Sequence, residues 1–91
     1  MQKNKLLFGC VADDFTGAGD GASFLVKSGI STVLYNGIPK KNLEDKNVQG
    51  AVIALKTRNV KKKQAVVESL KAFAWLKEQG ARIFYFKYCS T

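Results

Sequence analysis

The fold is decided by the stretch Cys10-Val-Ala-Asp-Asp-Phe-Thr-Gly-Ala-Gly-Asp-Gly21. An apolar run over residues 6–12 ends in two carboxylates, Asp13 and Asp14, and the chain then passes through three glycines into an amphipathic segment. A short apolar run followed by a glycine-rich turn and then by helical periodicity predicts a strand, a tight turn and the start of a helix.

This turn has the residue types of a site for an anionic group. Glycines allow a ligand to approach the backbone, and the first N–H groups of a helix attract negative charge. A carboxylate at such a place suits phosphoryl transfer, because an aspartate can accept the proton of the attacking hydroxyl. We therefore take Asp13 and Asp14 as candidate catalytic residues, and Thr16 and Gly17 as candidate substrate-binding residues. The alternative is a structural one, an aspartate N-cap before a glycine-rich turn.

The 91 residues suffice for one small domain with a core, because apolar residues make up 46% of the chain and charged residues 24%. The net charge of +8 lies entirely in residues 40–91, since residues 1–39 carry as many acidic as basic side chains. The basic residues are scattered apart from one run, Lys61-Lys62-Lys63, which is typical of a solvated helix start. No nucleic-acid-binding motif accompanies this run, so a nucleic-acid partner is not favoured.

The cysteines and the hydropathy pattern favour a cytoplasmic protein. Cys10 and Cys89 stand in apolar or strand-end positions without metal-ligand spacing, and the chain has no histidine. Buried reduced thiols are therefore expected, and no metal site. No segment approaches the ~20 apolar residues that span a bilayer, so no membrane partner is expected.

Strands and helices are predicted to alternate along the chain. The strands are expected at residues 6–12, 32–35, 51–55 and 82–86, and the helices before Gly29 and over residues 60–79. This alternation predicts an α/β fold, a Rossmann-like three-layer domain with a mostly parallel sheet of about four strands. Because residues 87–91 are loop-like and polar, we expect residues 1–91 to be an incomplete N-terminal substrate-binding domain, a fragment of a two-domain protein.

The second helix is expected to bury one apolar face. The residues that share this face are Val66, Val67, Leu70, Phe73, Ala74 and Leu76. Trp75 is expected on the opposite side, either as a half-exposed aromatic residue or as a contact for a second domain or subunit.

Ligands of open parallel sheets bind beyond the carboxyl ends of the strands. There the chain places Asp13-Asp14, Lys56-Thr57-Arg58, and Lys87 with Ser90-Thr91. Arg58 can bind a carboxylate with two hydrogen bonds, and Lys56 or Lys87 adds a positive charge. The polar residues at these three strand ends, called tips below, predict a pocket for a small polyhydroxylated acid.

With these residues in place, a resemblance becomes specific. The segments 12–18, 56–58 and 86–91, together with Asp20, resemble the N-terminal domain of the four-carbon acid sugar kinases, which include 3-oxo-tetronate, threonate and erythronate kinases. The resemblance runs the length of the chain. It implies ATP-dependent phosphorylation of a four-carbon acid, with the acid sugar held in the N-terminal domain and ATP with Mg²⁺ in a separate C-terminal domain.

By position, the resemblance makes Asp13 or Asp14, Arg58, Lys87 and Ser90 substrate-site residues, and it leaves open which aspartate is the base. Gly19 stands where the family commonly has threonine, and the given sequence does not include the rest of the substrate loop or the ATP domain that the resemblance implies. The chain alone is therefore expected to bind no ATP and to be inactive.

Two other interpretations remain open at this stage. The segment Thr16-Gly-Ala-Gly-Asp20 imitates the anion-binding motif of ribokinase-like sugar kinases, although there the motif comes late in a longer chain. The basic half of the chain could instead belong to a non-catalytic binding module. Homo-oligomer formation is also open.

Overall fold

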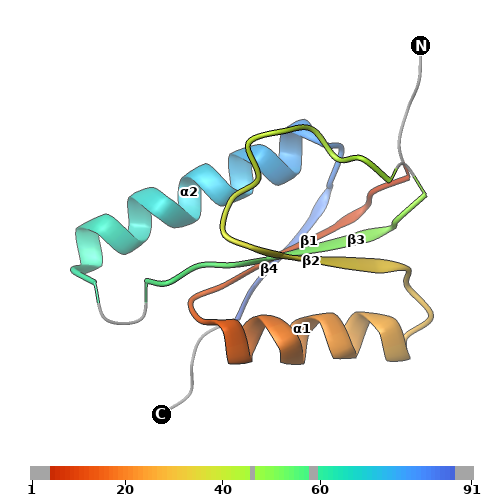
Figure 1. Ribbon diagram of the computed structural model, residues 1–91, viewed down its shortest axis with the longest axis horizontal. Helices are drawn as coiled ribbons and strands as arrows, with labels where there is room; N and C mark the ends of the chain where they lie inside the picture. The colour runs from red at the N-terminus through yellow and green to blue at the C-terminus, as the bar shows by residue number, and fades with distance from the viewer. Residues whose placement is uncertain (1–4, 46, 58–59, 88–91) are drawn as a thin grey trace.

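The computed structural model describes residues 5–45, 47–57 and 60–87. Figure 1 shows its six elements in chain order. They are β1 (Phe8–Ala12), α1 (Phe15–Lys27), β2 (Thr32–Asn36), β3 (Gly50–Ala54), α2 (Lys62–Glu78) and β4 (Ile83–Lys87).

The four strands form one parallel sheet in the order β2-β3-β1-β4. Val11 of β1 lies between Ile53 of β3 and Phe86 of β4 in the register. The two central strands, β1 and β3, are almost completely buried, as expected for parallel strands that are covered on both faces. The predicted α/β fold with a parallel sheet is confirmed.

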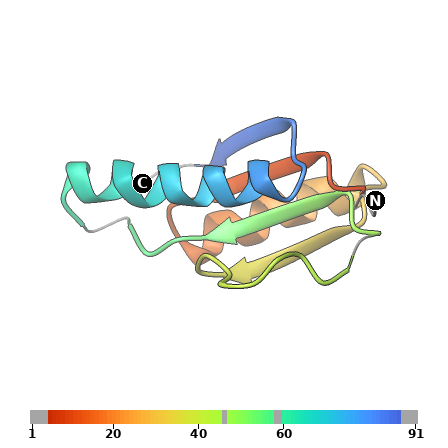
Figure 2. The ribbon, with the colours of Figure 1, turned by 90° about the horizontal axis from the view of Figure 1, so that it is seen from above.

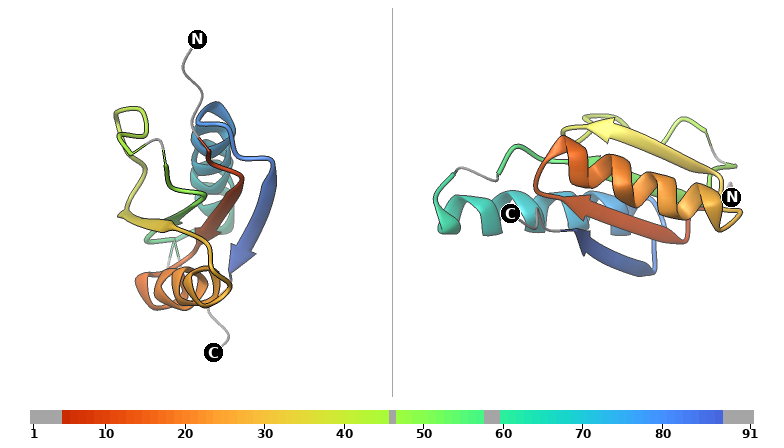
Figure 3. Two further views of the ribbon diagram at one scale, coloured as in Figure 1. Left: turned by 90° about the vertical axis from the view of Figure 1, so that its right-hand side faces the viewer. Right: turned by 90° about the horizontal axis from the view of Figure 1, so that it is seen from below.

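The sheet lies between two helical layers (Figures 1 and 3). Helix α1 packs Ala18 and Leu25 on one face, against Cys10, Ala12 and their neighbours on β3. On the other face, a larger core joins α2, the sheet and the segment between β2 and β3. Its buried residues are Leu6, Val11, Leu43, Val48, Ala51, Ile53, Leu55, Ala72, Leu76 and Ala81.

The connection between β2 and β3 covers part of the same face of the sheet as α2. Leu43, at its centre, is buried, and its N–H donates to Oε1 of Gln79 at the end of α2 (2.8 Å). The indole N–H of Trp75 donates to the carbonyl oxygen of Lys41 (3.1 Å), and its ring packs edge-on against Tyr35. The expectation that Trp75 projects away from the core is therefore wrong, because this connection and α2 cover the same face of the sheet.

The predicted core face of α2 is also partly wrong. Ala72 and Leu76 are buried, whereas Leu70 is 63% exposed and Val66 is 50% exposed. The first turns of the helix extend past the ends of the strands and have no sheet beneath them (Figure 2), and Leu70 lies beside the edge strand β4. The core contacts come from the second half of α2.

Both helices end at a glycine in the left-handed region, Gly29 (φ 85°) and Gly80 (φ 113°), as glycine at this position predicts. Within the described part of the chain, no helix is long and apolar enough to cross a bilayer.

Candidate functional site

Three strand ends meet at the carboxyl edge of the sheet, because β1 lies between β3 and β4. The N–H of Asp13 donates to the carbonyl oxygen of Lys87, and the N–H of Thr57 donates to the carbonyl oxygen of Asp13, both at 3.3 Å. The backbone pairing thus continues one residue beyond the strands. The tips of β1, β3 and β4 lie side by side, as the sequence predicts.

The chain leaves β1 and β3 in opposite directions. After β1 it turns to α1 on one face, and after β3 it turns to α2 on the other (Figure 1). Ligands of open α/β sheets bind where neighbouring connections diverge in this way. Asp13 and Thr57 lie at this point, and Asp13 is partly buried.

A hollow of about 420 Å³ opens beside Asp13. Its lining residues are Asp13, Thr57, Lys62, Ala65, Val66, Ser69, Leu70, Phe73 and Phe86. Four of these residues bring polar groups, namely a carboxylate, two hydroxyls and an ammonium group, and the other five are apolar. The polar groups are of the kinds needed to bind a small hydroxylated anion.

Asp14 has a local structural role. It is the N-cap of α1, and its Oδ1 accepts a hydrogen bond of 2.6 Å from the N–H of Gly17. Gly17 is buried, and a Cβ at this position would lie 3.0 Å from Oδ1 of Asp14 and 3.3 Å from Cγ of Lys87. A residue without a side chain therefore lets the end of β4 pass close to the start of α1. Thr16 is exposed beside them.

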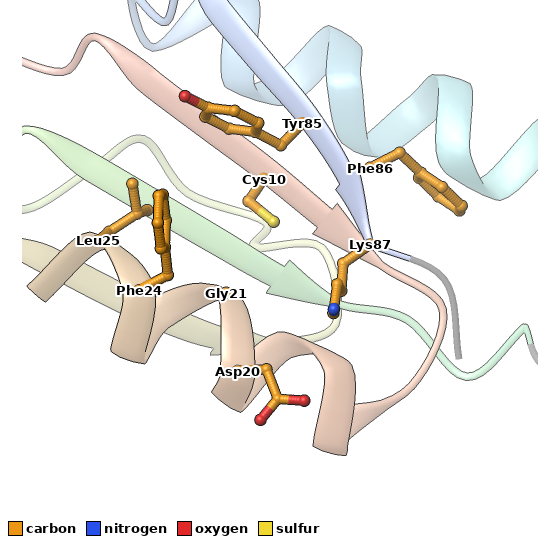
Figure 4. A pocket seen from close by; sticks show the side chains of 8 residues that line it. All are labelled: Cys10, Asp20, Gly21, Phe24, Leu25, Tyr85, Phe86 and Lys87. Carbon is orange, nitrogen blue, oxygen red and sulfur yellow. The ribbon is translucent and has the colours of Figure 1, made fainter. Parts of the chain in front are cut away.

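Lys87 lines a second hollow, of about 270 Å³, on the α1 side of the sheet. In Figure 4 its side chain extends from the end of β4 towards α1, and Asp20 lies on the adjacent turn of the helix. Further along this hollow the lining is apolar, with Phe24 and Tyr85. The structure thus places Lys87 next to Asp13 in the backbone but on a different face of the sheet.

Cys10 lies at the base of this second hollow and is buried. Burial raises the pKa of the Cys10 thiol, and the positive charge of Lys87 opposes this effect only in part. The thiol therefore stays protonated at neutral pH, in agreement with the buried reduced cysteine predicted from the sequence.

Lys56 lies apart from Asp13. It is exposed and lines another hollow, between the ends of β2 and β3, together with Asn36 and Glu68. Three other predicted site residues, Arg58, Ser90 and Thr91, lie outside the described residues.

Two polar residues of the Asp13 hollow were missed from the sequence, Lys62 and Ser69. Lys62 was interpreted as part of a solvated helix start. The sequence does carry a signal for both residues, which is their spacing. Residues seven apart share one face of a helix, and the first turns of a helix that follows a parallel strand lie near the carboxyl edge of the sheet.

Among the described residues, no group of three or more His, Cys, Asp or Glu side chains could hold a metal ion.

Known proteins are similar to this chain in sequence and in fold. A 3-oxo-tetronate kinase of Haemophilus influenzae is 54% identical over 85 residues, which cover 93% of this chain and 20% of the kinase. A 3-oxo-tetronate kinase of Escherichia coli K12 is 49% identical over 83 residues, 91% of this chain and 21% of the kinase. The chain thus spans about a fifth of the length of the curated relatives that it matches.

Solved structures agree with this match. The crystal structure of Haemophilus influenzae protein HI1011 has a TM-score of 0.85 and 54% identity, over 90% of this chain and 20% of that one. A crystal structure from Salmonella typhimurium LT2, named as a candidate tRNA synthase, has a TM-score of 0.88 and 47% identity, over 96% of this chain and 20% of that one. The family described as "Sugar-binding N-terminal domain" matches residues 8–91. This chain therefore belongs to the family of sugar-binding N-terminal domains.

Proposed function

We propose that this chain is the acid-sugar-binding part of an ATP-dependent kinase whose substrate is a four-carbon acid of the 3-oxo-tetronate, threonate or erythronate type. The observation that carries the proposal is the position of Asp13, between the tips of β3 and β4 and beside Thr57 and Lys62. Membership of the sugar-binding family and the names of the relatives supply the reaction class. The expected cytoplasmic location belongs to this proposal.

The geometry favours Asp13 over Asp14 as the base. Oδ1 of Asp14 already accepts the Gly17 N–H that starts α1, whereas Asp13 lines the hollow. In the proposed complex, Asp13 accepts the proton of the substrate hydroxyl that attacks phosphorus. The ammonium group of Lys62 pairs with the substrate carboxylate, and the hydroxyl of Thr57 binds a substrate hydroxyl. Arg58, Lys87, Ser90 and Thr91 stay candidate substrate contacts on the strength of the resemblance.

We place ATP and Mg²⁺ on the part of the protein that corresponds to the rest of the relatives. Phosphoryl transfer requires both substrates to be held together. Mg²⁺ in kinase sites is bound largely by the phosphates of the nucleotide, with one or two carboxylates, so we place it with ATP. The 91-residue chain alone is therefore expected to show no kinase turnover.

A chimaera tests the proposal. Residues 8–91 replace the matching segment of the Haemophilus influenzae 3-oxo-tetronate kinase, and ATP-dependent phosphorylation of four-carbon acids is measured. Asp13→Asn is expected to lower kcat at least ~100-fold, as for loss of a general base. Lys62→Gln is expected to raise KM about tenfold with a smaller effect on kcat, because it removes a contact to the bound carboxylate.

Val26→Lys is the matched control, since Val26 is exposed and lines neither the Asp13 hollow nor the Lys87 hollow. An active chimaera in which Asp13→Asn and Lys62→Gln behave like Val26→Lys would show that the site lies elsewhere.

A nucleic-acid function is the second candidate, and two observations favour testing it. The chain carries a net charge of +8, and one structural neighbour is named as a candidate tRNA synthase. Thermal-shift measurements with erythronate, threonate, phosphate and a tRNA-sized oligonucleotide separate the two functions. Stabilisation by the acids supports the kinase proposal, and stabilisation by the oligonucleotide alone contradicts it.

A further inference from the structure

Strand β4 forms an open edge of the sheet. It pairs with β1 on one side, and on its other side no strand follows within the described residues. Ile83, Phe84 and Tyr85 are 41%, 40% and 43% exposed, although they are large and apolar or aromatic. The opposite edge strand, β2, is partly buried for most of its length, and Trp75 of α2 contacts its Tyr35. The two edges therefore differ in how they are covered.

The sequence of β4 is unlike that of a solvent-exposed edge. Stable edge strands are usually protected by charges, proline or a bulge, because a long apolar edge pairs with other chains. From Ile83 to Phe86 the strand has none of these, and its one charge, Lys87, stands at the end. This composition is typical of a strand with neighbours on both sides.

The uncovered apolar surface continues onto both faces of β4. On the α1 side, Tyr85 and the exposed Phe24 line the 270 Å³ hollow of Figure 4. On the α2 side, Phe84, Leu70 and Phe73 line another hollow of about 410 Å³. Phe73 of α2 packs against Phe84 and Phe86, but β4 forms one side of the molecule (Figure 3), and its residues 83–85 stay about two-fifths exposed. An occupant that buries this surface must supply a strand together with apolar side chains on both faces.

We infer that β4 accepts a further β-strand from the polypeptide that corresponds to the four-fifths of the kinase relatives not spanned by this chain. The length of the relatives argues for this occupant, because the chain matches only 20% of the Haemophilus influenzae kinase. A second copy of this chain is disfavoured by charge, since each copy carries +8. The inference rests on family membership and not on the proposed substrate.

The backbone hydrogen bonds between β4 and the chain of β1 show which groups would pair with the new strand. The N–H of Ile83 donates to Leu7, and the carbonyl of Lys87 accepts from Asp13, so these two residues direct their backbone groups towards β1. Because successive residues of a strand alternate, the N–H and C=O of Phe84 point towards the open edge. Proline at position 84 removes this N–H, and proline is tolerated in a strand where the N–H faces outwards from an edge.

Co-expression tests the inference. The 91-residue chain is tagged and expressed with a Haemophilus influenzae 3-oxo-tetronate kinase that lacks its own matching segment, and the products are analysed by size-exclusion chromatography with light scattering. We expect a soluble one-to-one complex. We expect Phe84→Pro to weaken it at least ~10-fold, by loss of backbone hydrogen bonds and apolar contact, and Phe84→Ala to weaken it less because the N–H remains. Val26→Lys is expected to bind like the unchanged chain.

Circular dichroism and Tm of each variant show whether the chain itself is folded. The inference is overturned if the truncated kinase stays insoluble or elutes separately. It is also overturned if folded Phe84→Pro binds as well as Phe84→Ala, or if the intact kinase, whose own segment occupies the position, binds equally well. A complex that forms without phosphorylating any four-carbon acid would leave the β4 interface standing and count against the proposed function alone.

Discussion

The main-chain N–H of Asp13 donates a hydrogen bond to the carbonyl oxygen of Lys87 at a distance of 3.3 Å. On the other side, the carbonyl oxygen of Asp13 accepts from the N–H of Thr57. The backbone that carries the Asp13 side chain is therefore held by both neighbouring strand ends. A proposed catalytic group on such a rigid element is positioned by the sheet itself, and changes at the start of α1 or in the core are expected to act mainly on stability.

Two glycines of α1 are predicted to respond in opposite ways to alanine. At Gly19 a Cβ has no neighbour within 4 Å, so Gly19→Ala should raise the free energy of unfolding by roughly 0.5–1 kcal/mol through helix propensity. At Gly17 the Cβ would meet Asp14 and Lys87, so Gly17→Ala should leave the free energy of unfolding unchanged or lower it. Urea unfolding of both variants measures the difference, and equal stabilisation would show that the strand end is not packed on α1.

Asp14 is predicted to stabilise the chain as the N-cap of α1. Asp14→Ala removes the acceptor for the Gly17 N–H and should lower the free energy of unfolding by about 1 kcal/mol. Asp14→Asn retains a capping oxygen and should recover most of this loss. If the alanine variant were as stable as the unchanged chain in thermal unfolding, Asp14 would be available for another role and its exclusion as the base would fail.

Leucines on two faces of α2 are predicted to differ strongly. Leu76 is fully buried, so Leu76→Ala should cost roughly 2–5 kcal/mol in the free energy of unfolding. Leu70 is exposed, and Leu70→Ala should change stability by less than about 0.5 kcal/mol. Chemical denaturation of the isolated chain distinguishes them. A large loss of stability in Leu70→Ala would mean that the apolar face beside β4 is already covered.

The raised pKa of Cys10 predicts a specific pH dependence. An acid whose pKa is higher in the folded state than in the unfolded state keeps its proton longer in the folded state, so rising pH favours unfolding. The free energy of unfolding should fall above pH ~8.5, by up to about 1.4 kcal/mol per pH unit. Cys10→Ala should remove the part of this slope that is due to Cys10, and Cys89→Ala should retain that part.

Comparison with Cys10→Ala is needed because the pKa of Tyr35 is also raised, by burial and by Glu44 and Asp45, so Tyr35 adds a slope of its own. A slope that is the same with and without Cys10 would contradict the buried thiol. At neutral pH, iodoacetamide should modify Cys10 slowly unless the chain is unfolded.

The sequence was sufficient to predict the alternating elements, because the apolar runs and the glycines at positions 29 and 80 mark their ends. It also predicted that the ends of β1, β3 and β4 would lie at one edge, which follows from the parallel arrangement, and the strand order makes these three ends neighbours. The buried face of α2 was not predictable, because apolar residues occur on more than one side of this helix. The structure shows that Leu76 faces the core, whereas Leu70 lies beside the open edge at β4, and that the first turns of α2 extend beyond the sheet.

The sequence also could not show which lysine lies near Asp13. Lys56 follows β3 directly and was the natural candidate, but it lies in the hollow beside β2. Lys62, six residues later, lines the Asp13 hollow. Sequence spacing brings both to the carboxyl edge, and the path of the chain from β3 to α2 decides which of them lies near Asp13.

Titration of the ¹⁵N-labelled chain with erythronate and threonate, followed by amide chemical shifts in NMR spectra, tests the central claim most directly. The account predicts saturable shifts that concentrate at the amides of Asp13, Asp14, Thr57 and Lys62, weaker in Lys62→Gln and absent with uncharged erythritol. Shifts that concentrate at another part of the sheet, or spectra that do not respond to either acid, would contradict an acid-sugar site at this edge.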